Sequence, residues 1–347
     1  MFADDVDFNA CRDPAGKFTD VRNMKRVTLK DIAARAGVSV ALVSNYLNRH
    51  PSARMSKETK EKIDTALVEL NYHCSDIARS LRTGRSHIIG YFTENLRNQV
   101  NQNEMIEIYD AAARENYRVI VGFSPNSGMI LENIRAFIAR GCDAVIISGY
   151  FPQHIVDQLA ILPVPTVMLN THDTASFPGK MLRYDYRTAV RSAIDHLKKG
   201  GHTGIYYMCG SAMPEDQRYS ECIRNVSAEN ILHMPDKEFM FDQWYSMIKK
   251  HPDCTAILHM NDFLAMKTIQ YASAAGIAVP DDLAVIGFDN IKATDYTVPT
   301  LSSIRRPLAS AAEHAVKALL AELENKPYDL PETLPCEFIR RDSVKNK

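Results

Sequence analysis

Several patterns that mark particular protein classes are missing from this sequence of 347 residues. Its apolar runs, such as the one at 144–147, stop far short of the roughly 18 residues that a transmembrane helix needs. The first stretch, MFADDVDFNACRD, is acidic and lacks the basic start and apolar block of a secretory signal. We therefore expect a protein without a membrane partner that stays in the cytoplasm.

Closely spaced cysteines are also absent. The seven cysteines are an odd number, and no two of them stand in a CxxC arrangement. This excludes the usual disulfide frameworks and zinc sites, so we expect free, buried thiols and no metal.

Signatures of common enzyme classes are missing as well. No G-x-G-x-x-G follows an apolar run, and there is no P-loop, HExxH or G-x-S-x-G. The eleven histidines are scattered, and His87, His202 and His259 lie in or beside apolar runs, where a structural role is the simpler interpretation. We expect no catalytic residues, no cofactor and no enzymatic activity.

Charge, in contrast, is distributed unevenly along the chain. The segment 24–85 holds 12 Lys or Arg against 6 Asp or Glu, although the whole chain has a net charge of -1. A basic segment attached to an acidic body suggests that the segment meets a polyanion. The length suggests about two domains.

The basic segment contains VTLKDIAARAGVSVALVSNYLN, from Val27 to Asn48. Thr28 and Asp31 fit a capping arrangement for a first helix, and apolar residues then recur at helical spacing. Gly37 follows where the chain must turn sharply, because glycine accepts positive φ. Ser39 is placed to cap a second helix. A third helix begins near Ser56, which completes a small helix-turn-helix core with the inward residues Leu29, Ile32, Ala33, Ala36, Val43, Tyr46, Leu47, Ile63, Ala66, Leu67 and Leu70.

These motifs closely resemble the lactose-repressor/galactose-repressor family of bacterial transcription regulators. The resemblance is carried by TLKDIAARAGVS, ELNY and ARSLRTGRS, and later by MNDFLAMKTI, GIAVPDDLAVIGFDN and LSSIRRP, in the family's order. It implies a DNA-binding head at 24–72, a hinge helix and linker at 73–85, and an effector-binding and dimerisation domain at 86–347. Residues 1–23 have no counterpart, and we expect a disordered extension there.

The resemblance also implies which residues meet DNA. In this family the second helix of the head lies in the major groove, and Asn45 is suited to pair with adenine while Val40 and Ala41 touch thymine methyls. Large polar or basic residues are common in relatives at these positions, so this chain departs from the pattern. The expected DNA contacts are Thr28, Ser39, Val40, Ala41, Ser44, Asn45, Asn48, Arg79, Leu81 and Arg82.

Leu81 matches the hinge leucine that the family wedges into the minor groove at the centre of a palindromic site. Such a wedge costs unstacking energy that the contacts of the bent DNA offset. Arg79, Arg82 and Arg85 flank it with charge for phosphates. The alternative is that Leu81 is an ordinary core residue.

After Ser86 the chain alternates apolar β-rich runs with helical phrases, which indicates an α/β fold with parallel sheets covered on both faces. Some 260 residues are too many for one small sheet, so we expect two lobes with a ligand at the carboxyl ends of the strands. The resemblance specifies a type I periplasmic-binding-protein-like core.

Polar residues at strand ends are the candidate effector contacts. By resemblance these are Asn170, Arg218, Asn261, Asp262 and Asp289. Aspartate is common in relatives at the position of Asn170, and Glu221 and Cys222 replace the usual glycine and aromatic after Arg218. Such a set suits a sugar or a nucleobase. The alternative for Asp262 and Asp289 is that they cap the helices that follow them.

Taken together, the sequence predicts a homodimeric regulator, with a repressor favoured, that binds a palindromic operator in double-stranded DNA and associates with the nucleoid when bound. A small-molecule effector, with a sugar favoured, would control its operator affinity from between the lobes. The C-terminal RRDSVKNK lacks a leucine heptad tail, so we expect a dimer and not a tetramer. The alternative is a sugar-binding sensor module that does not read DNA.

Overall fold

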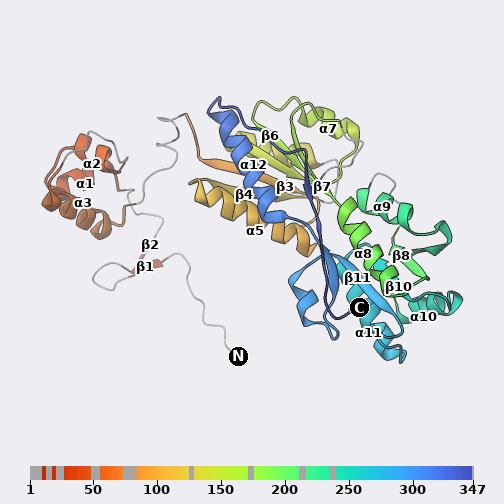
Figure 1. Ribbon diagram of the computed structural model, residues 1–347. Helices are drawn as coiled ribbons and strands as arrows, with labels where there is room; N and C mark the ends of the chain where they lie inside the picture. Colours follow the sequence, from red (N-terminus) through yellow and green to blue (C-terminus); the bar gives the residue numbers. More distant parts are fainter. Residues whose placement is uncertain are drawn as a thin grey trace. The chain divides into compact units, whose positions relative to one another are not determined.

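The chain forms two compact units in a computed structural model, residues 1–83 and residues 84–347 (Figure 1). The structure describes residues 10–12, 18–20, 27–47, 55–72, 80, 84–124, 129–170, 176–210, 216–234 and 240–345. Each unit is considered by itself. In the described part of the chain, no helix is long and apolar enough to cross a membrane.

The first unit contains a short antiparallel strand pair and three helices. Strands β1 (Ala10–Arg12) and β2 (Phe18–Asp20) pair within the segment expected to be an extension. Helices α1 (Leu29–Ala36), α2 (Val40–Leu47) and α3 (Lys57–Glu69) form the helical head, in which α1 packs on both α2 and α3.

The caps of α1 follow from its sequence. The Thr28 backbone N–H and hydroxyl each donate to Asp31 Oδ2 at 2.7 Å, which closes the N-terminal turn. Gly37 ends the helix at φ 66°, ψ 34°, and the Val38 N–H then reaches the Ala33 carbonyl at 3.0 Å. The buried core of the head is Ile32, Ala33, Ala36, Val43, Ile63 and Ala66.

The second unit contains two six-stranded sheets, one in each of two lobes. The first lobe has the strand order β13-β7-β6-β5-β3-β4, all parallel. Its strands are β3 (Ile88–Thr93), β4 (Arg118–Phe123), β5 (Ala144–Ser148), β6 (Thr166–Leu169), β7 (Lys180–Asp185) and β13 (Thr333–Pro335). Helices α5 (Gln99–Arg114) and α12 (Leu308–Leu323) pack on each other, and α6 (Ile130–Ala139) and α7 (Gln153–Leu159) complete the lobe.

The second lobe has the order β14-β12-β11-β10-β8-β9, parallel except for the antiparallel pair of β12 and β14. Its strands are β8 (Ile205–Cys209), β9 (Ile231–His233), β10 (Ala256–His259), β11 (Ala284–Asp289), β12 (Ser302–Arg305) and β14 (Glu337–Ile339). Its helices are α8 (Arg187–Lys199), α9 (Gln217–Asn225), α10 (Phe241–Lys250) and α11 (Asp262–Ala274), with short 3-10 turns η3 (Ala228–Asn230) and η4 (Lys292–Tyr296).

Burial on both faces explains the continuous apolar strands. In β5 all five residues are buried, with Ile146 in the cluster shared with α5 and α12 and Val145 in the cluster formed with α6 and α7. The cluster containing Ile146 continues into the second lobe beneath α8, whereas α10 and α11 cover a separate cluster around Trp244. The predicted α/β fold with two parallel-sheet lobes is therefore confirmed.

The chain passes between the lobes three times (Figure 1). The passages lie between β7 and α8, between β12 and α12, and between β13 and β14. Tyr186, Arg306 and Cys336 stand at these three points, and all three are buried. The first lobe is therefore completed by residues from the C-terminal end of the chain.

The five described cysteines are free and buried, as the sequence predicts. They are Cys142, Cys209, Cys222, Cys254 and Cys336. Burial raises the pKa of the Cys209 thiol to about 11, so this thiol stays protonated at neutral pH.

Candidate functional site

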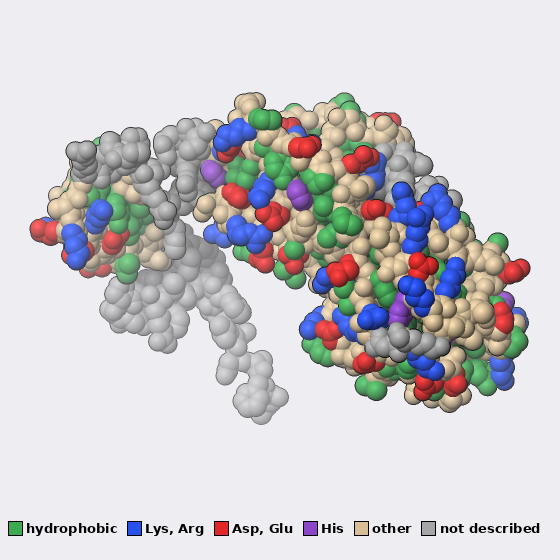
Figure 2. Space-filling model, in the orientation of Figure 1, with side chains coloured by type: hydrophobic (Ala, Val, Ile, Leu, Met, Phe, Trp, Pro, Cys, Tyr) green, Lys and Arg blue, Asp and Glu red, His purple; other side chains and the backbone are tan. Residues whose placement is uncertain are grey.

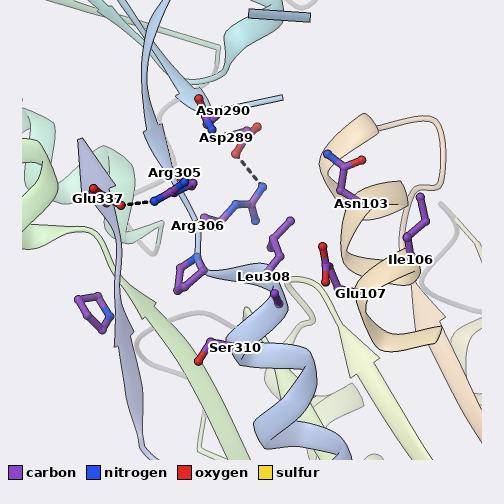
Figure 3. A pocket seen from close by; sticks show the side chains of 13 residues that line it. Asn103, Ile106, Glu107, Asp289, Asn290, Arg305, Arg306, Leu308, Ser310 and Glu337 are labelled. Carbon is purple, nitrogen blue, oxygen red and sulfur yellow. Dashed lines mark hydrogen bonds and ion pairs between the residues drawn. The ribbon is translucent and has the colours of Figure 1, made fainter. Parts of the chain in front are cut away.

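A cavity of about 490 Å³ lies between the two lobes (Figure 3). The first lobe contributes Asn103, Ile106 and Glu107 of α5, and the second contributes Asp289 and Asn290 at the end of β11. The crossover into α12 lines it with Arg305, Arg306 and the residues at 307–310. A ligand in this space would contact both lobes and the crossover at the same time.

Asp289 and Arg306 form a buried ion pair in this cavity. Arg306 Nη2 donates to Asp289 Oδ1 at 2.7 Å, and each side chain is only 5% exposed. Asp289 ends β11 with φ 103°, a backbone conformation that few side chains adopt and that an ion pair can help to hold. Burial alone would lower the pKa of Arg306, but the Asp289 carboxylate, together with Tyr186 and Tyr184, raises it above its ordinary value. The predicted effector contact Asp289 is thus already paired within the protein.

Arg306 also contacts the first lobe. Its guanidinium lies 5.6 Å from the centre of the Tyr184 ring, which belongs to β7. The Tyr184 hydroxyl donates to Glu104 of α5 at 2.9 Å, and Glu104 accepts a second bond from Tyr91 at 3.0 Å. A polar chain therefore runs from α5 through Arg306 to Asp289, and it crosses from one lobe to the other.

Arg218, at the start of α9, is held by Asp216. Its Nη2 donates to Asp216 Oδ2 at 2.5 Å, its Nε is 3.1 Å from both oxygens, and its Nη1 reaches the Met260 carbonyl at 3.4 Å. Burial raises the pKa of Asp216, but Arg218 more than compensates, so that pKa lies below its ordinary value. The fork of Arg218 is therefore fixed before any ligand arrives.

The replacements after Arg218 have a structural explanation. Glu221 is 1% exposed, and its Oε1 accepts from Arg224 Nη1 at 2.6 Å and lies 3.4 Å from Arg187 Nε. It therefore ties α9 to the first turn of α8. Cys222 is fully buried in the core beneath α8. Glu221 and Cys222, which stand where relatives have a glycine and an aromatic residue, are therefore both packed into the protein.

Asn170 faces this group from the first lobe. It follows β6 with φ 52°, and its Oδ1 accepts from the Tyr150 hydroxyl at 3.2 Å. Burial raises the pKa of Tyr150 to about 12, and the charges of the Arg218–Asp216 and Arg306–Asp289 pairs act on it as well. Three of the five expected effector residues, Asn170, Arg218 and Asp289, therefore belong to one electrostatic group that includes Tyr150.

The other two, Asn261 and Asp262, have structural roles. Asn261 caps α11 by accepting the Leu264 N–H at 2.9 Å. Asp262 is 1% exposed and accepts from the Ile291 N–H at 2.8 Å and from the Ser303 hydroxyl at 2.5 Å. These bonds hold the loop after Asp289 and strand β12 in place, so Asp262 supports the backbone that positions Asp289.

Gly287 explains how Asp262 reaches β11. A Cβ at position 287 would lie 2.1 Å from Asp262 Oδ1, a contact that no side chain tolerates. Burial, followed by the charge of Asp289, raises the pKa of Asp262 to about 8. At neutral pH Asp262 is therefore mostly protonated, which reduces its repulsion of Asp289.

A second cavity, of about 380 Å³, opens at the carboxyl ends of β3 and β5. It is lined by Glu94, Asn95, Ser124, Ile130, Tyr150, Phe151 and Pro152. Burial raises the pKa of Glu94 to about 7, partly offset by a backbone hydrogen bond from Tyr150. Because Tyr150 also belongs to the group above, this cavity adds polar groups on the side of the first lobe.

In the helical head, the expected DNA contacts at the start of α2 are exposed, whereas those further along the helix are half-buried. Val40 is 39% exposed although it is apolar, and Ala41 is exposed beside it, whereas Val43 is fully buried. Ser44 and Asn45 are half-buried. Ser39 caps α2, its Oγ accepting the Leu42 N–H at 3.2 Å. The second helix therefore presents small and apolar side chains on its accessible face.

Tyr46 fixes α2 against α3, because its hydroxyl lies 2.8 and 2.9 Å from the two oxygens of Asp64. Thr28 is exposed at the start of α1, where its hydroxyl is bonded to Asp31. The remaining expected contacts, Asn48, Arg79, Leu81 and Arg82, and most of the expected hinge helix lie outside the described residues.

Four residues of the site were not predicted from the sequence. The roles of Arg306 and Tyr150 depend on the folded chain, because their partners Asp289 and Asn170 lie elsewhere in the sequence. Asp216 stands two residues before its partner Arg218, but no motif marks this pair. Glu94 had a usable signal: it directly follows the apolar run of β3, as Asn170 follows that of β6. Across the described ranges, no group of three or more His, Cys, Asp or Glu side chains could hold a metal ion.

Comparisons with known proteins agree with this architecture. Residues 28–75 match the model for bacterial regulatory proteins of the lacI family, and residues 194–344 match that for a periplasmic binding protein-like domain. The chain is 27% identical over 333 residues to the ribose operon repressor of Halalkalibacterium halodurans, covering 92% of this chain and 97% of that one. It is 25% identical to the lactose operon repressor of Escherichia coli, covering 92% and 91%.

The solved structure of the lac repressor dimer bound to operator and the anti-inducer ONPF has the same fold. It superimposes with a TM-score of 0.78 at 22% identity, covering 92% of this chain and 99% of that one. These relatives are transcriptional regulators and not enzymes. With a lacI-type helix-turn-helix head followed by a two-lobed periplasmic-binding-protein-like core, the chain belongs to the lactose-repressor/galactose-repressor family of bacterial transcription regulators.

Proposed function

We propose that this regulator is a homodimeric repressor of transcription, and that a small hydroxyl-rich molecule of the sugar class sets its affinity for a palindromic operator. The observation that carries the proposal is the group of prearranged charges between the lobes, which contacts both lobes and a crossover. Relatives that include the ribose operon repressor support the same class of effector.

The chemistry of the site fits hydroxyl groups. Asp289 uses only Oδ1 in its bond to Arg306, which leaves Oδ2 as an acceptor, and Asn170 offers amide donors. Each Arg is balanced by a carboxylate, so the two pairs together carry no net charge. A neutral ligand with several hydroxyls therefore complements the site better than an ion does.

We propose that the ligand acts by changing how the lobes meet. Arg306 contacts Asp289 in one lobe and Tyr184 in the other, so a ligand that engages Asp289 alters both contacts. The resulting lobe arrangement would shift the population in which residues 73–85 form the hinge helix. Because coupling is reciprocal, operator DNA should change the affinity for the ligand by the same factor.

Exposed apolar side chains support the proposed dimer. Large apolar side chains are exposed on both lobes, and a dimer interface would cover part of them. They are Ile106, Tyr109, Phe123, Phe263, Tyr296 and Val298.

The first test is selection of bound sequences from a random DNA pool at two salt concentrations, with and without a panel of sugars. We expect a palindrome of about 16 to 20 base pairs whose recovery changes with one sugar. For that sugar, Asp289→Asn should raise the concentration needed by about tenfold, whereas Asp281→Asn, in an exposed pair with Lys345, should not. Sequence-blind, salt-sensitive binding would instead favour a sugar-binding sensor that does not read DNA.

A second test addresses the hinge. Leu81→Ala should weaken binding to the selected operator far more than binding to scrambled DNA, because a wedge acts only where the DNA is bent. Val68→Ala, at an apolar residue of the head that is 81% exposed, should change neither affinity. Equal losses on both DNAs would contradict the wedge.

A further inference from the structure

A basic hollow lies on the second lobe, lined from α8 and from the residue that follows β14. Its volume is about 620 Å³, within the range of small-molecule sites. It is lined by Thr188, Arg191, Ser192, Asp195, His196, Lys199, Gly200 and Arg340. None of these residues takes part in the interlobe site. Figure 2 shows Lys and Arg side chains gathered over the part of this lobe that carries α8 and α9.

The sequence of α8 places the lining residues on one stripe. Thr188, Ser192, Asp195 and Lys199 are spaced by four, three and four residues, and Arg191 stands four residues before Asp195, which is the spacing of one helix face. The opposite face of α8 is buried, and Ala189, Ala193 and Leu197 lie in the core. The packing of α8 therefore turns this polar stripe outward, where Arg340 meets it.

The cations of the hollow are not neutralised. Within the described ranges, Arg191, Lys199 and Arg340 have no ion pair or hydrogen bond to another side chain, in contrast to exposed pairs such as Lys317–Glu313. Lys199 lies in the last turn of α8, where the helix dipole favours a cation. Arg191 stands mid-helix and Arg340 outside the helix, so the dipole does not account for them.

The charged and polar side chains that line the hollow indicate the charge and the hydrogen-bonding groups of a ligand that would fit it. Three cations from two separate segments outweigh the one carboxylate, Asp195, and favour a ligand with more than one negative charge. The hydroxyls of Thr188 and Ser192 are suited to donate to phosphate oxygens, whereas Asp195 suits a ligand hydroxyl.

We propose that this hollow binds the phosphate group of a small phosphorylated molecule, at a site separate from the interlobe cavity. Two connections would let it influence the lobes. Helix α8 starts directly after Tyr186, and β14 starts directly after Cys336, both of which are crossover residues. A ligand held between α8 and Arg340 thus bridges two segments that lead out of crossovers.

The test is isothermal titration of the full chain with inorganic pyrophosphate at low salt, where exposed charges are least screened. We expect saturable binding of one pyrophosphate per chain at this hollow. Arg191→Gln and Arg340→Gln should each weaken it about tenfold, since each removes a hydrogen-bonding charge. Arg140→Gln is the control, because Arg140 is also exposed but lies in the first lobe.

Three results would overturn the proposal. The first is an absence of saturable binding to the wild-type chain. The second is unchanged binding in the variant that carries both Arg191→Gln and Arg340→Gln, because pyrophosphate would then bind elsewhere, such as on the basic head. The third is an equal loss in Arg140→Gln, which would mean an effect of overall charge. Unchanged fluorescence of the buried Trp244 verifies that each variant is folded.

Discussion

The buried pair of Asp289 and Arg306 makes a quantitative prediction. Removing one partner leaves the other charge buried without compensation, which costs about 3 to 5 kcal/mol for pairs of this kind. The full cost applies here because each side chain is only 5% exposed, so water screens little of the 2.7 Å contact. We therefore expect Arg306→Gln and Asp289→Asn each to lower the free energy of unfolding by about 3 kcal/mol.

The variant with both changes distinguishes this explanation from simple loss of packing. Once neither charge is present, the desolvation cost disappears, so the double variant should be more stable than the sum of the single effects implies, by about 2 kcal/mol or more. The assay is equilibrium unfolding in urea followed by the fluorescence of Trp244, the single tryptophan, which is buried in the second lobe.

The neighbouring pair supplies a matched control. Arg305 binds Glu337, but these side chains are 53% and 61% exposed, and exposed pairs contribute about 1 kcal/mol or less. Arg305→Gln and Glu337→Gln should therefore have small effects that add. If the effects of Arg306→Gln and Asp289→Asn also add, the two charges are not coupled, and the explanation of the site given above is wrong.

Two further predictions concern single residues. Gly37→Ala should destabilise the head by about 1 kcal/mol because φ is 66°, whereas Gly37→Asn should destabilise it less. Thermal melting followed by circular dichroism compares the two variants, and equal melting temperatures would refute the role of φ. Burial raises the pKa of Asp262 from 3.8 to about 8, so its protonated form favours the folded state, and this contribution is lost as the pH rises through that range. Asp262→Asn should therefore flatten the decline of stability with pH in urea unfolding, an effect that exposed Asp281→Asn should not reproduce.

Local signals were enough to predict the head and the long strands. The Thr28–Asp31 cap, the turn at Gly37 and the inward residues such as Ile32 and Val43 depend on neighbours within a few residues. The apolar runs that became β3 and β11 are likewise continuous in the sequence. These features are set by propensity and burial, which the sequence displays directly.

The short strands at the sheet edges and the buried residues that pair within the site were harder to predict. β13 and β14 are three residues each, and they form only because distant strands provide their edges. Arg306 follows another arginine that is exposed, and no local pattern separates the two. Asn261 and Asp262 were assigned by position in the family, yet their bonds show a cap and a buried support.

The three passages between the lobes also determine when the protein can fold during synthesis. Helix α12 packs on α5, and β13 forms the edge of the first sheet beside β7, but both are made after the whole second lobe up to β12. Until residue 323 has left the ribosome, α5 has no α12 to cover its apolar face, and until residue 335 follows, the first sheet lacks β13. Translation therefore produces the second lobe from α8 to β12 before the first lobe can close, although domains usually complete their fold in order from the N-terminus.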